Sequence, residues 1–494
     1  MSKNRENVFY QDYEDAIKKL EKSEKQNKEL RSIIEDLKIT IRRLESKQDK
    51  SNATIEKLNE TISNLNNTIS MLLNQASKNS KNSSMPPSKD KVKPKKSPNE
   101  YNLRTKSDKK SGGQKGHKGT GLTKEKAMEL LKDPGVIYKE KIYKVKGDSK
   151  RQQIEKYELD IEINTIVTKK IYIFGNYREA KEEIQTTDVI YGKNIKTICT
   201  ELCVHHSIAI KRLTEFIKSI TNSKINLSPG TIINFIKEVS SKTKNTIDTL
   251  VEKLLVKNYL YTDATPSKGF DSNVFFRNYS TKDIVIFKAN ENKKNETIDK
   301  DNILPRYRNT LIHDHEVPIY NYGTRHVECN AHILRYLTEV KENTKTKWSQ
   351  EMIDYLLELK HKKEECLAKE DYEFLKEEVM DKYRKILEEG LEENKQIELK
   401  YDKERANNLA KRMLKYADEH LRFYKEIEAP FDNNESERDL RMIKTKTKVS
   451  GCFRSLEGAK WFANIMSIIK TAVKKGINVH EAIIKILSNE VVFE

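Results

Sequence analysis

The stretch that decides the fold runs from Asn258 to Asn290 and reads NYLYTDATPSKGFDSNVFFRNYSTKDIVIFKAN. Apolar and β-branched residues are concentrated in three segments of it, at 258–265, 273–280 and 283–290. Short polar connections join these segments, which is typical of an antiparallel meander. A fourth segment, TLIHD at 310–314, follows a connection long enough for a helix, so a right-handed crossover can return it parallel to the first. The sequence therefore predicts a mixed sheet.

Two of the predicted strands end in an acid. Asp263 lies near the end of the first segment, and Asp314 closes the fourth. A single acid at a strand end commonly forms a turn or caps a helix. Ligands, however, collect at the C-terminal ends of adjacent parallel strands. The two aspartates are therefore candidate site residues.

A third acidic stretch is PFDNNESERDLR at 430–441. Taken alone, it is typical of a solvated helix start, in which Asp432 or Asn433 caps the helix and Glu435 and Glu437 lie near the positive end of its dipole. Beside the two strand-end aspartates, a glutamate from this stretch would complete a set of three carboxylates. Spacing alone does not choose between the two glutamates.

Three carboxylates form a site of hard oxygen ligands, which Mg²⁺ and Mn²⁺ prefer. Two such ions about 3.5–4 Å apart stabilise the attacking and leaving oxygens of a phosphoryl displacement, as in nucleases and strand-transfer enzymes. The chain carries 94 Lys and Arg against 76 Asp and Glu, a net charge of +18. This excess favours a polyanionic partner, nucleic acid before membrane.

Length and composition limit the class of protein further. A chain of 494 residues has room for about three domains. Its five cysteines are scattered and make no disulfide framework, which is typical of a reducing cytosol. The sequence shows no signal peptide and no run of 18 apolar residues. We therefore expect a cytoplasmic protein that is not associated with a membrane.

The N-terminal segment 13–76 keeps a heptad repeat with few breaks. Ile recurs at position a from Ile34 to Ile69, and Leu recurs at position d from Leu30 to Leu72, while Asn27 occupies an a position. This pattern favours a parallel two-stranded coiled coil with a polar residue that fixes the register. A single amphipathic helix packed on its own domain would not need a strict repeat over this length. We expect a homodimer or a higher oligomer.

The remaining segments are assigned by composition and periodicity. Residues 77–123 form a basic flexible linker or a basic arm that follows DNA phosphate. Residues 124–185 alternate like a small β segment, residues 186–256 like helices with a helix-turn-helix-like break, and about 340–429 like a helical insertion. In the helical part, Cys199 and Cys203 are predicted to be core residues.

The segment HVECNAH at 326–332 closes another strand and starts a helix. Within it, Cys329 and His332 have the C-x-x-H spacing of half a zinc site. The sequence offers no second convincing pair, so a structural role or a place in the wall of the active site is the better interpretation.

Together these segments resemble the transposases of the insertion sequence 66 family, which are DDE-type recombinases with a ribonuclease-H-like core. The resemblance runs from about residue 55 to the end. In chain order, the motifs that carry it are NSSMPPSKD, GGQKGHKGTG, SPGTIINFI, TDAT, LIHDHEVPIYNYG, HVECNAHILRYL, PFDNNESERDLR and GCFRSLEGAKWFANIMSIIKT.

Carried over position by position, the resemblance implies that Asp263, Asp314 and Glu437 are the catalytic carboxylates and the ligands of two Mg²⁺ or Mn²⁺ ions. Glu437 is favoured over Glu435 because the family motif places the acid directly before an arginine. Six further positions match family motifs as candidates for structural support, for the wall of the site or for phosphate contacts: Cys329, His332, Asn433, Asn434, Arg438 and Arg441.

One departure concerns zinc. Members of the family commonly carry a cysteine-based zinc finger after the GGQ-x-GH motif, but no cysteine lies between Thr123 and Glu183. This argues against a zinc ribbon and against zinc as a cofactor. The expected fold is multidomain, α + α/β. It comprises the coiled coil, a small β-rich segment, a helical DNA-binding bundle, a ribonuclease-H-like core at 257–474 with the helical insertion, and a C-terminal helix or tail at 475–494.

The expected function is that of a DNA transposase, which binds the terminal inverted repeats of its element and catalyses metal-dependent strand cleavage and transfer to target DNA. Accessory proteins of the same element are candidate partners. The alternative is a non-catalytic DNA-binding protein, either a decayed or domesticated transposase or a zipper-dimerised regulator. A ribonuclease-H-like nuclease without strand transfer is a second alternative.

Overall fold

The computed structural model describes residues 3–79, 82–83, 124–140, 157, 159, 161–171, 190–269 and 273–493. The chain divides into two compact units. The helical unit comprises residues 1–91, 335–355 and 381–415, and the sheet unit comprises 92–334, 356–380 and 416–494. The described residues are mostly helical and contain one mixed five-stranded sheet, which fits the expected α + α/β class.

The sheet unit is built on five strands in the spatial order β3-β2-β1-β4-β5. They are β1 (Tyr259–Lys268), β2 (Asn273–Ser280), β3 (Val285–Asn290), β4 (Thr310–His313) and β5 (Arg325–Glu328). β1, β2 and β3 pair antiparallel, β4 lies parallel to β1, and β5 lies parallel to β4. The predicted meander and its parallel return are therefore confirmed.

In chain order, the helices of the sheet unit lie before, between and after the strands. Those before the sheet are α2 (Lys124–Leu130), α4 (Lys193–Thr200), the π-helix η2 (Glu201–His205), α5 (Ile210–Ile220), α6 (Pro229–Lys242) and α7 (Lys244–Leu255). Between strands lie α8 (Asn295–Lys300) and the 3₁₀ turns η3 (Leu304–Arg306) and η4 (Val317–Asn321). Later elements are η5 (Glu373–Lys376), α13 (Ala417–Lys425), α14 (Asn434–Ser450), α15 (Leu456–Lys474) and α16 (Val479–Ser488).

The edge of the sheet at β3 is covered by α15. The Thr471 hydroxyl accepts a hydrogen bond from the Val285 N–H at 3.0 Å, and the Ser467 hydroxyl accepts one from the Phe287 N–H at 2.8 Å. Unpaired strand edges otherwise invite pairing with another chain. Side chains of the apolar helix that the sequence places at the C-terminal end of the core therefore complete the sheet.

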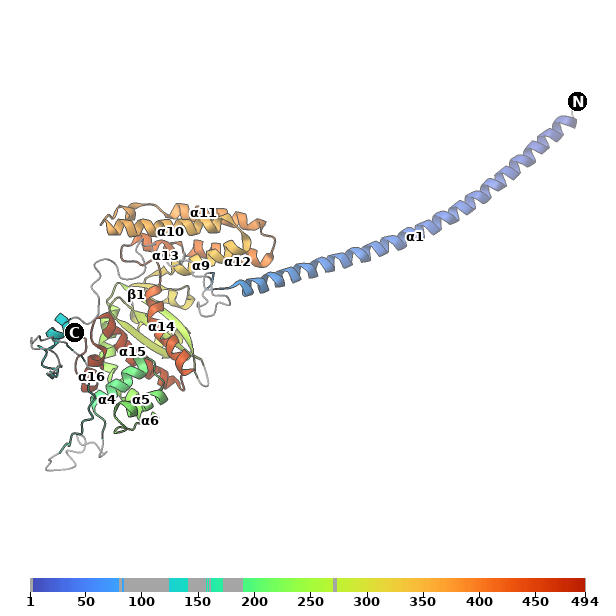
Figure 1. Cartoon of the computed structure of the whole chain (residues 1–494). Coiled ribbons are helices and arrows are strands. Elements are labelled where there is room, and N and C mark those ends of the chain that lie inside the picture. The colour runs from blue at the N-terminus through green and yellow to red at the C-terminus, as the bar shows by residue number, and fades with distance from the viewer. Residues whose placement is uncertain are drawn as a thin grey trace, which may run out of the picture. The chain divides into compact units, whose positions relative to one another are not determined.

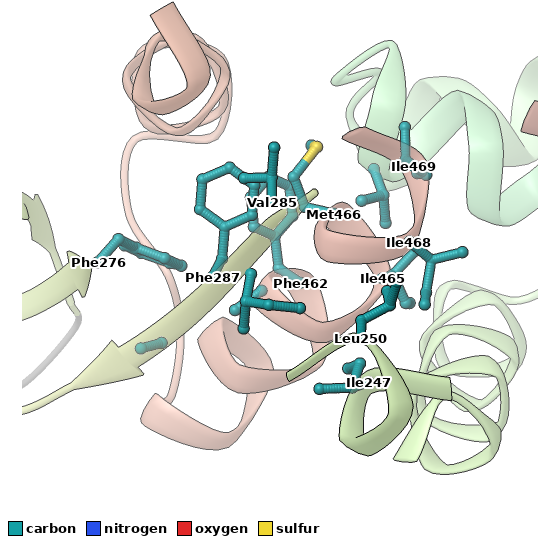
Figure 2. Close-up of a cluster of buried hydrophobic side chains, with 14 of the residues drawn as sticks. Ile247, Leu250, Phe276, Val285, Phe287, Phe462, Ile465, Met466, Ile468 and Ile469 are labelled. Carbon is teal, nitrogen blue, oxygen red and sulfur yellow. The ribbon is translucent and has the colours of Figure 1, made fainter. Parts of the chain in front are cut away.

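The main apolar core joins β2, β3 and α15 to α7. Phe276 and Phe287 lie beside Phe462 and Met466 of α15, and Leu250 approaches from α7 (Figure 2). All five side chains are buried. Burial of a large apolar side chain stabilises the fold by about 1.5–3 kcal/mol, so this cluster fixes α15 on the sheet.

The segment predicted to be helical, 186–256, is helical in the described residues from α4 to α7. Ser228 caps α6 by accepting a hydrogen bond from the Thr231 N–H at 3.0 Å, and Pro229 opens the helix. Cys199 and Cys203 are buried, which confirms that they are core residues. The helix-turn-helix-like role of this segment stays a prediction.

The helical unit contains α1 (Lys3–Ser77), α11 (Met380–Glu393), the turn η6 (Asn394–Gln396) and α12 (Lys400–Lys415). Two further helices, α9 (Asn330–Thr344) and α10 (Lys347–Ala368), are divided between the two units. The predicted helical insertion is thus helical. Helix α1 is a single continuous helix (blue in Figure 1). No helix in the described part of the chain is both long enough and apolar enough to cross a membrane.

The last turns of α1 contact α12 through polar side chains. Ser70 and Asn74 donate hydrogen bonds to the two carboxylate oxygens of Asp402, each at 2.7 Å, and all three residues are buried. The neighbouring heptad residues Ile69 and Leu72 remain 53% and 54% exposed. Among the described residues, these side chains of the apolar stripe of α1 therefore stay about half exposed even where another face of the helix is packed.

A glycine in α11 allows a tryptophan ring to approach the helix. A Cβ added at Gly390 would lie 2.6 Å from Cγ of Trp348, well inside van der Waals contact. Trp348 is itself buried and donates its indole N–H to Asn394 at 2.9 Å, so the ring has little freedom to move.

We therefore expect Gly390→Ala to lower the free energy of unfolding of the helical unit by about 1–3 kcal/mol through overpacking. In an ordinary helix, the same change raises stability by up to about 1 kcal/mol. Denaturation followed by circular dichroism measures the effect. In a Trp348→Ala background, where the ring is absent, Gly390→Ala should no longer destabilise. An unchanged cost in that background would contradict the explanation.

Two predicted segments fall largely outside the described residues. The basic linker at 77–123 is described only at 77–79 and 82–83. The β segment predicted at 124–185 instead begins with the helix α2 at 124–130, its described stretches 131–140 and 161–171 contain no assigned strand, and most of the rest lies outside the described residues. Both assignments therefore stay predictions.

Candidate active site

Strand pairing brings the two predicted aspartates level with each other. β1 and β4 pair in parallel from Tyr259 opposite Thr310 to Tyr261 opposite Ile312. The same offset places Asp263 beside Asp314, directly after β4 ends. β1 itself continues past Asp263, because it remains paired with β2 as far as Lys268. The aspartates thus lie where the parallel pairing ends, as the sequence predicts.

The acidic stretch at 430–441 starts α14 and lies against the same strands. Asn433 occupies the N-cap position but makes no side-chain cap bond. The Asp432 carboxylate instead accepts a hydrogen bond from the Asn434 N–H at 3.0 Å. The buried Asn433 amide donates to the Thr262 carbonyl at 3.1 Å, and its backbone N–H donates to Cys329 Sγ at 3.2 Å. Asn433 therefore fixes the start of α14 on β1 and on the residue that follows β5.

A second buried amide connects β1, β2 and α14. The Asn278 side-chain oxygen accepts hydrogen bonds from the Asp263 N–H at 3.0 Å and from the Ser436 hydroxyl at 2.6 Å. Its amide nitrogen donates to the Ser280 hydroxyl at 2.9 Å. Asn278 is fully buried. It sets both the backbone of one aspartate and the first turn of the helix that carries the glutamates.

We expect Asn278→Ala to lower the free energy of unfolding of the sheet unit by about 1–3 kcal/mol, because a buried N–H and a buried hydroxyl lose their acceptor. Asn273→Ala is the matched control, since Asn273 lies exposed at the start of the same strand. That change should stay within about 0.5 kcal/mol. Urea denaturation of both variants measures the difference, and equal stabilities would show that the bridge contributes nothing.

The C-x-x-H pair lies directly beside Asp314. His332 Nδ1 lies 3.2 Å from Asp314 Oδ1, and one ligand atom of each of Asp314, Cys329 and His332 lies within 4.8 Å of the others. Burial raises the pKa of the Cys329 thiol. Against the effect of burial, Cys329 and Asp314 raise the pKa of His332. The 3.2 Å contact makes a protonated His332 an ion-pair partner of Asp314.

The two aspartates titrate in opposite directions. Burial and the charge of Asp314 raise the pKa of Asp263 to about 7, and Glu437 acts in the same direction. Burial also acts to raise the pKa of Asp314, but the hydrogen bond and charge of His332 outweigh it and lower that pKa. The repulsion at Asp263 is the electrostatic condition that a bound cation relieves.

Spacing in the sequence does not distinguish Glu435 from Glu437, but their ion pairs in the structure differ. Glu435 forms ion pairs with Arg438 at 2.6 Å and with Lys474 at 2.9 Å. Glu437 has no ion-pair partner among the described residues, and its charge contributes to the raised pKa values of Asp263 and Asp432. Glu437 is therefore the glutamate that acts on the acidic cluster, while the charge of Glu435 is balanced by two cations.

One acid of this cluster was not assigned to the site in the sequence analysis. Asp432 was considered only as a helix cap, yet its pKa is raised by burial and by Glu437. Arg438 and Arg441 are exposed on α14, and Asn434 is half-buried beside them. Four carboxylates with two exposed arginines nearby fit Mg²⁺ or Mn²⁺ and a phosphate, since hard cations prefer oxygen ligands.

A buried network supports the loop that follows Asp314. The Glu328 carboxylate, at the end of β5, binds His315 Nδ1 at 2.5 Å, His420 Nε2 at 3.0 Å and the Tyr320 hydroxyl. On the other side of the loop, Glu316 forms a two-bond ion pair with the buried Arg277, at 2.7 and 3.0 Å. No local sequence pattern predicts this network, because its members meet only when β5, α13 and η4 are packed.

Comparison with known proteins agrees with the geometry. The family model described as "Transposase IS66 family" matches residues 189–461, and a second model, described as a family of unknown function (DUF6444), matches residues 13–123. No curated protein matches the chain. The first match includes all five strands and the acidic start of α14, and it covers more than half of the chain. The chain therefore belongs to the IS66 family of transposases.

Proposed function

We propose that this transposase cleaves and joins DNA at the ends of its own element, with Asp263, Asp314 and Glu437 as the ligands of two divalent metal ions. The observation that carries the proposal is that three acids from separate parts of the chain act on one another, because the charges of Asp314 and Glu437 both raise the pKa of Asp263. β1 and β4 supply the aspartates at the end of their parallel pairing, and α14 supplies the glutamate.

The strand arrangement supports a ribonuclease-H-like core. Three antiparallel strands are followed by two that run parallel to the first, in the order β3-β2-β1-β4-β5. In such a sheet, β1 and β4 are adjacent inner strands, and the proposed site lies where their parallel pairing ends. We assign the core to 257–474, with the helical insertion at about 340–429.

The protein side chains have distinct roles in the proposed reaction. Bound divalent ions would supply the charge that activates a water and stabilises the phosphorane-like transition state. Asp263, Asp314 and Glu437 would hold those ions, and His332 would keep Asp314 oriented. The exposed Arg438 would contact a phosphate of the substrate, since a guanidinium matches phosphate geometry.

Two displacements would follow each other at this site. Water would attack a phosphate at the element end, and the bond to the 3′ oxygen would break to leave a 3′ hydroxyl. That hydroxyl would then attack a phosphate of target DNA and release a new 3′ hydroxyl from the target. Each step replaces one phosphodiester oxygen by another, so no oxidant or reductant is required.

Oligomerisation is proposed through α1. Its heptad side chains are exposed along the helix, and the end of the helix packs through Ser70 and Asn74 instead. A row of exposed Ile and Leu on a long helix is covered in solution when a second copy supplies the same row. A homodimer would present two catalytic sites to the two ends of one element.

The test is incubation of the full-length protein with a labelled duplex that carries an element end and with target DNA, in Mg²⁺ or Mn²⁺. Metal-dependent nicks at the end and joined products are expected. Nicks without joined products would identify a nuclease. Binding of the end without nicks would identify a non-catalytic DNA-binding protein. Activity that persists in Asp263→Ala or Asp314→Ala would exclude the assigned site.

A further inference from the structure

A second group of metal-binding side chains lies away from the carboxylate cluster. Glu201 and His205 bound the π-helix η2, and His206 follows it directly. One ligand atom from each of these three residues lies within 4.8 Å of the others. His480, in the first turn of α16, places its Nδ1 3.1 Å from the second carboxylate oxygen of Glu201. Three imidazoles thus surround one carboxylate.

The π-helix explains why two consecutive histidines reach the same acid. Its hydrogen bonds join residues five apart, and the His206 N–H accordingly donates to the Glu201 carbonyl at 3.1 Å. Residues four and five positions after the acid then both lie near it. In an α-helix of 3.6 residues per turn, the fifth residue would point to another face. The two imidazole rings lie 4.6 Å apart.

We propose that Glu201, His205, His206 and His480 form a binding site for a divalent transition-metal ion, for which Zn²⁺ is the best match. Zn²⁺ is bound by His nitrogen and Glu oxygen in four-coordinate sites, whereas Mg²⁺ takes oxygen ligands. This site therefore selects a different class of ion from the carboxylate cluster, and it does not depend on the proposed catalysis.

The state of the side chains fits a ligand role. The Nδ1 atom of His205 is buried and has no hydrogen-bond partner in the described part of the chain. The side chains of His206 and His480 are 51% and 38% exposed, which leaves a path for an ion.

Two features oppose binding and are small enough to be overcome. Lys470 lies near enough to act on the pKa of His205, so its positive charge also disfavours a cation. The ligand atoms must also move closer together, because Zn²⁺ bonds to nitrogen are about 2.0–2.1 Å long, and His480 lies outside the group of three whose ligand atoms are within 4.8 Å of one another. Glu201 offsets the lysine charge, and the exposed imidazoles can rotate into place.

An ion at this position would connect distant parts of the sheet unit. Glu201 and His480 are 279 residues apart in the chain. α16 is also attached to the helical segment by its apolar face and by two lysines, Lys242, which donates to the Leu487 carbonyl at 2.8 Å, and Lys193, which donates to the Ser488 hydroxyl at 2.7 Å. Because the bound ion would hold η2 to α16, its binding free energy would add to the stability of the sheet unit.

The experiment is titration of the metal-free full-length protein with Zn²⁺ against a chromophoric chelator, together with thermal unfolding in Zn²⁺ and in Mg²⁺. We expect one Zn²⁺ per chain to bind at this site and to raise Tm by at least about 2 °C, and this rise, unlike a rise caused by Mg²⁺ at the carboxylate cluster, should be lost in His206→Ala and in His480→Ala. His206→Ala and His480→Ala should each weaken Zn²⁺ binding at least about 100-fold. Loss of a residue that only holds a metal ligand in place already lowers metal affinity by about 10–100-fold, and loss of the ligand itself should cost no less.

The matched control is His361→Ala, which removes an exposed imidazole paired with Glu365 elsewhere in the unit. It should leave the Zn²⁺ affinity unchanged. Since His206 and His480 are substantially exposed, their variants are expected to fold, and circular dichroism verifies this. Zn²⁺ binding that survives both variants, or that is lost only in Cys329→Ala, would place the ion elsewhere. Failure of the wild-type protein to bind Zn²⁺ would also overturn the proposal.

Discussion

Asp263→Asn is expected to reduce the rates of strand cleavage and joining at least about 10³-fold. The change removes a metal-ligand charge while keeping the shape of the side chain. Metal ions contribute several kcal/mol to such transition states, and each 1.36 kcal/mol is a factor of ten in rate. Asp314→Asn should have an effect of the same size. The measurement is single-turnover cleavage of an end-containing duplex at saturating protein.

Stability separates loss of metal binding from loss of folding. The raised pKa of Asp263 shows that its negative charge is disfavoured by burial and by Asp314. Neutralising the side chain relieves that repulsion, so Asp263→Asn should unfold at the same or a higher temperature than wild type in metal-free buffer. An inactive variant with a markedly lower Tm would instead show a general disruption of the fold.

The two glutamates of α14 provide an internal control. Glu437→Gln is expected to lose activity to about the same extent as the aspartate variants. Glu435→Gln should retain much more, because Glu435 is paired with Arg438 and Lys474 and lies outside the proposed ligand set. The opposite order, with Glu435→Gln inactive and Glu437→Gln active, would exchange the third ligand. Equal activity of both variants and wild type would remove α14 from the metal site.

The periodicity of the sequence was sufficient to predict the sheet and the place of the two aspartates. Runs of apolar and β-branched residues mark the strands, and the connection before β4 is long enough for the right-handed crossover that returns it parallel to β1. The choice of Glu437 over Glu435 came from the family motif. The structure supplies a physical reason, since Lys474 reaches Glu435 from α15, forty residues further along the chain.

Residues that support the site could not be predicted from the sequence. Asn278 is an ordinary polar residue in a strand until pairing with β1 and packing of α14 surround it. Lys363 is similar: it lies in a charged helix, yet it is buried and donates to the carbonyls of Phe423, Glu426 and Ala429, just before α14. Both roles depend on contacts between segments that are distant in sequence, and local sequence patterns do not predict such contacts.

Ile41→Lys combined with Leu44→Lys is expected to convert the dimer proposed for α1 to monomer. The two residues occupy successive a and d positions and are 52% and 58% exposed in the single chain. In a coiled coil, each would be buried against the partner helix. Loss of one large buried side chain costs about 2–5 kcal/mol, and both copies of the dimer lose theirs. The dissociation constant should rise at least about 10³-fold, since 1.4 kcal/mol is tenfold.

A control variant on the same helix distinguishes the effect of the heptad seam from the effects of helix propensity and of added charge. Ile39 is 56% exposed but lies outside the a and d positions, so Ile39→Lys changes the same residue type without touching the seam. This variant should remain dimeric. Sedimentation equilibrium of the full-length proteins, at concentrations spanning the wild-type dissociation constant, measures both. If Ile39→Lys dissociated the protein as strongly as Ile41→Lys with Leu44→Lys, association would depend on general hydrophobicity. If none of the variants changed the mass, the dimer would form elsewhere in the chain.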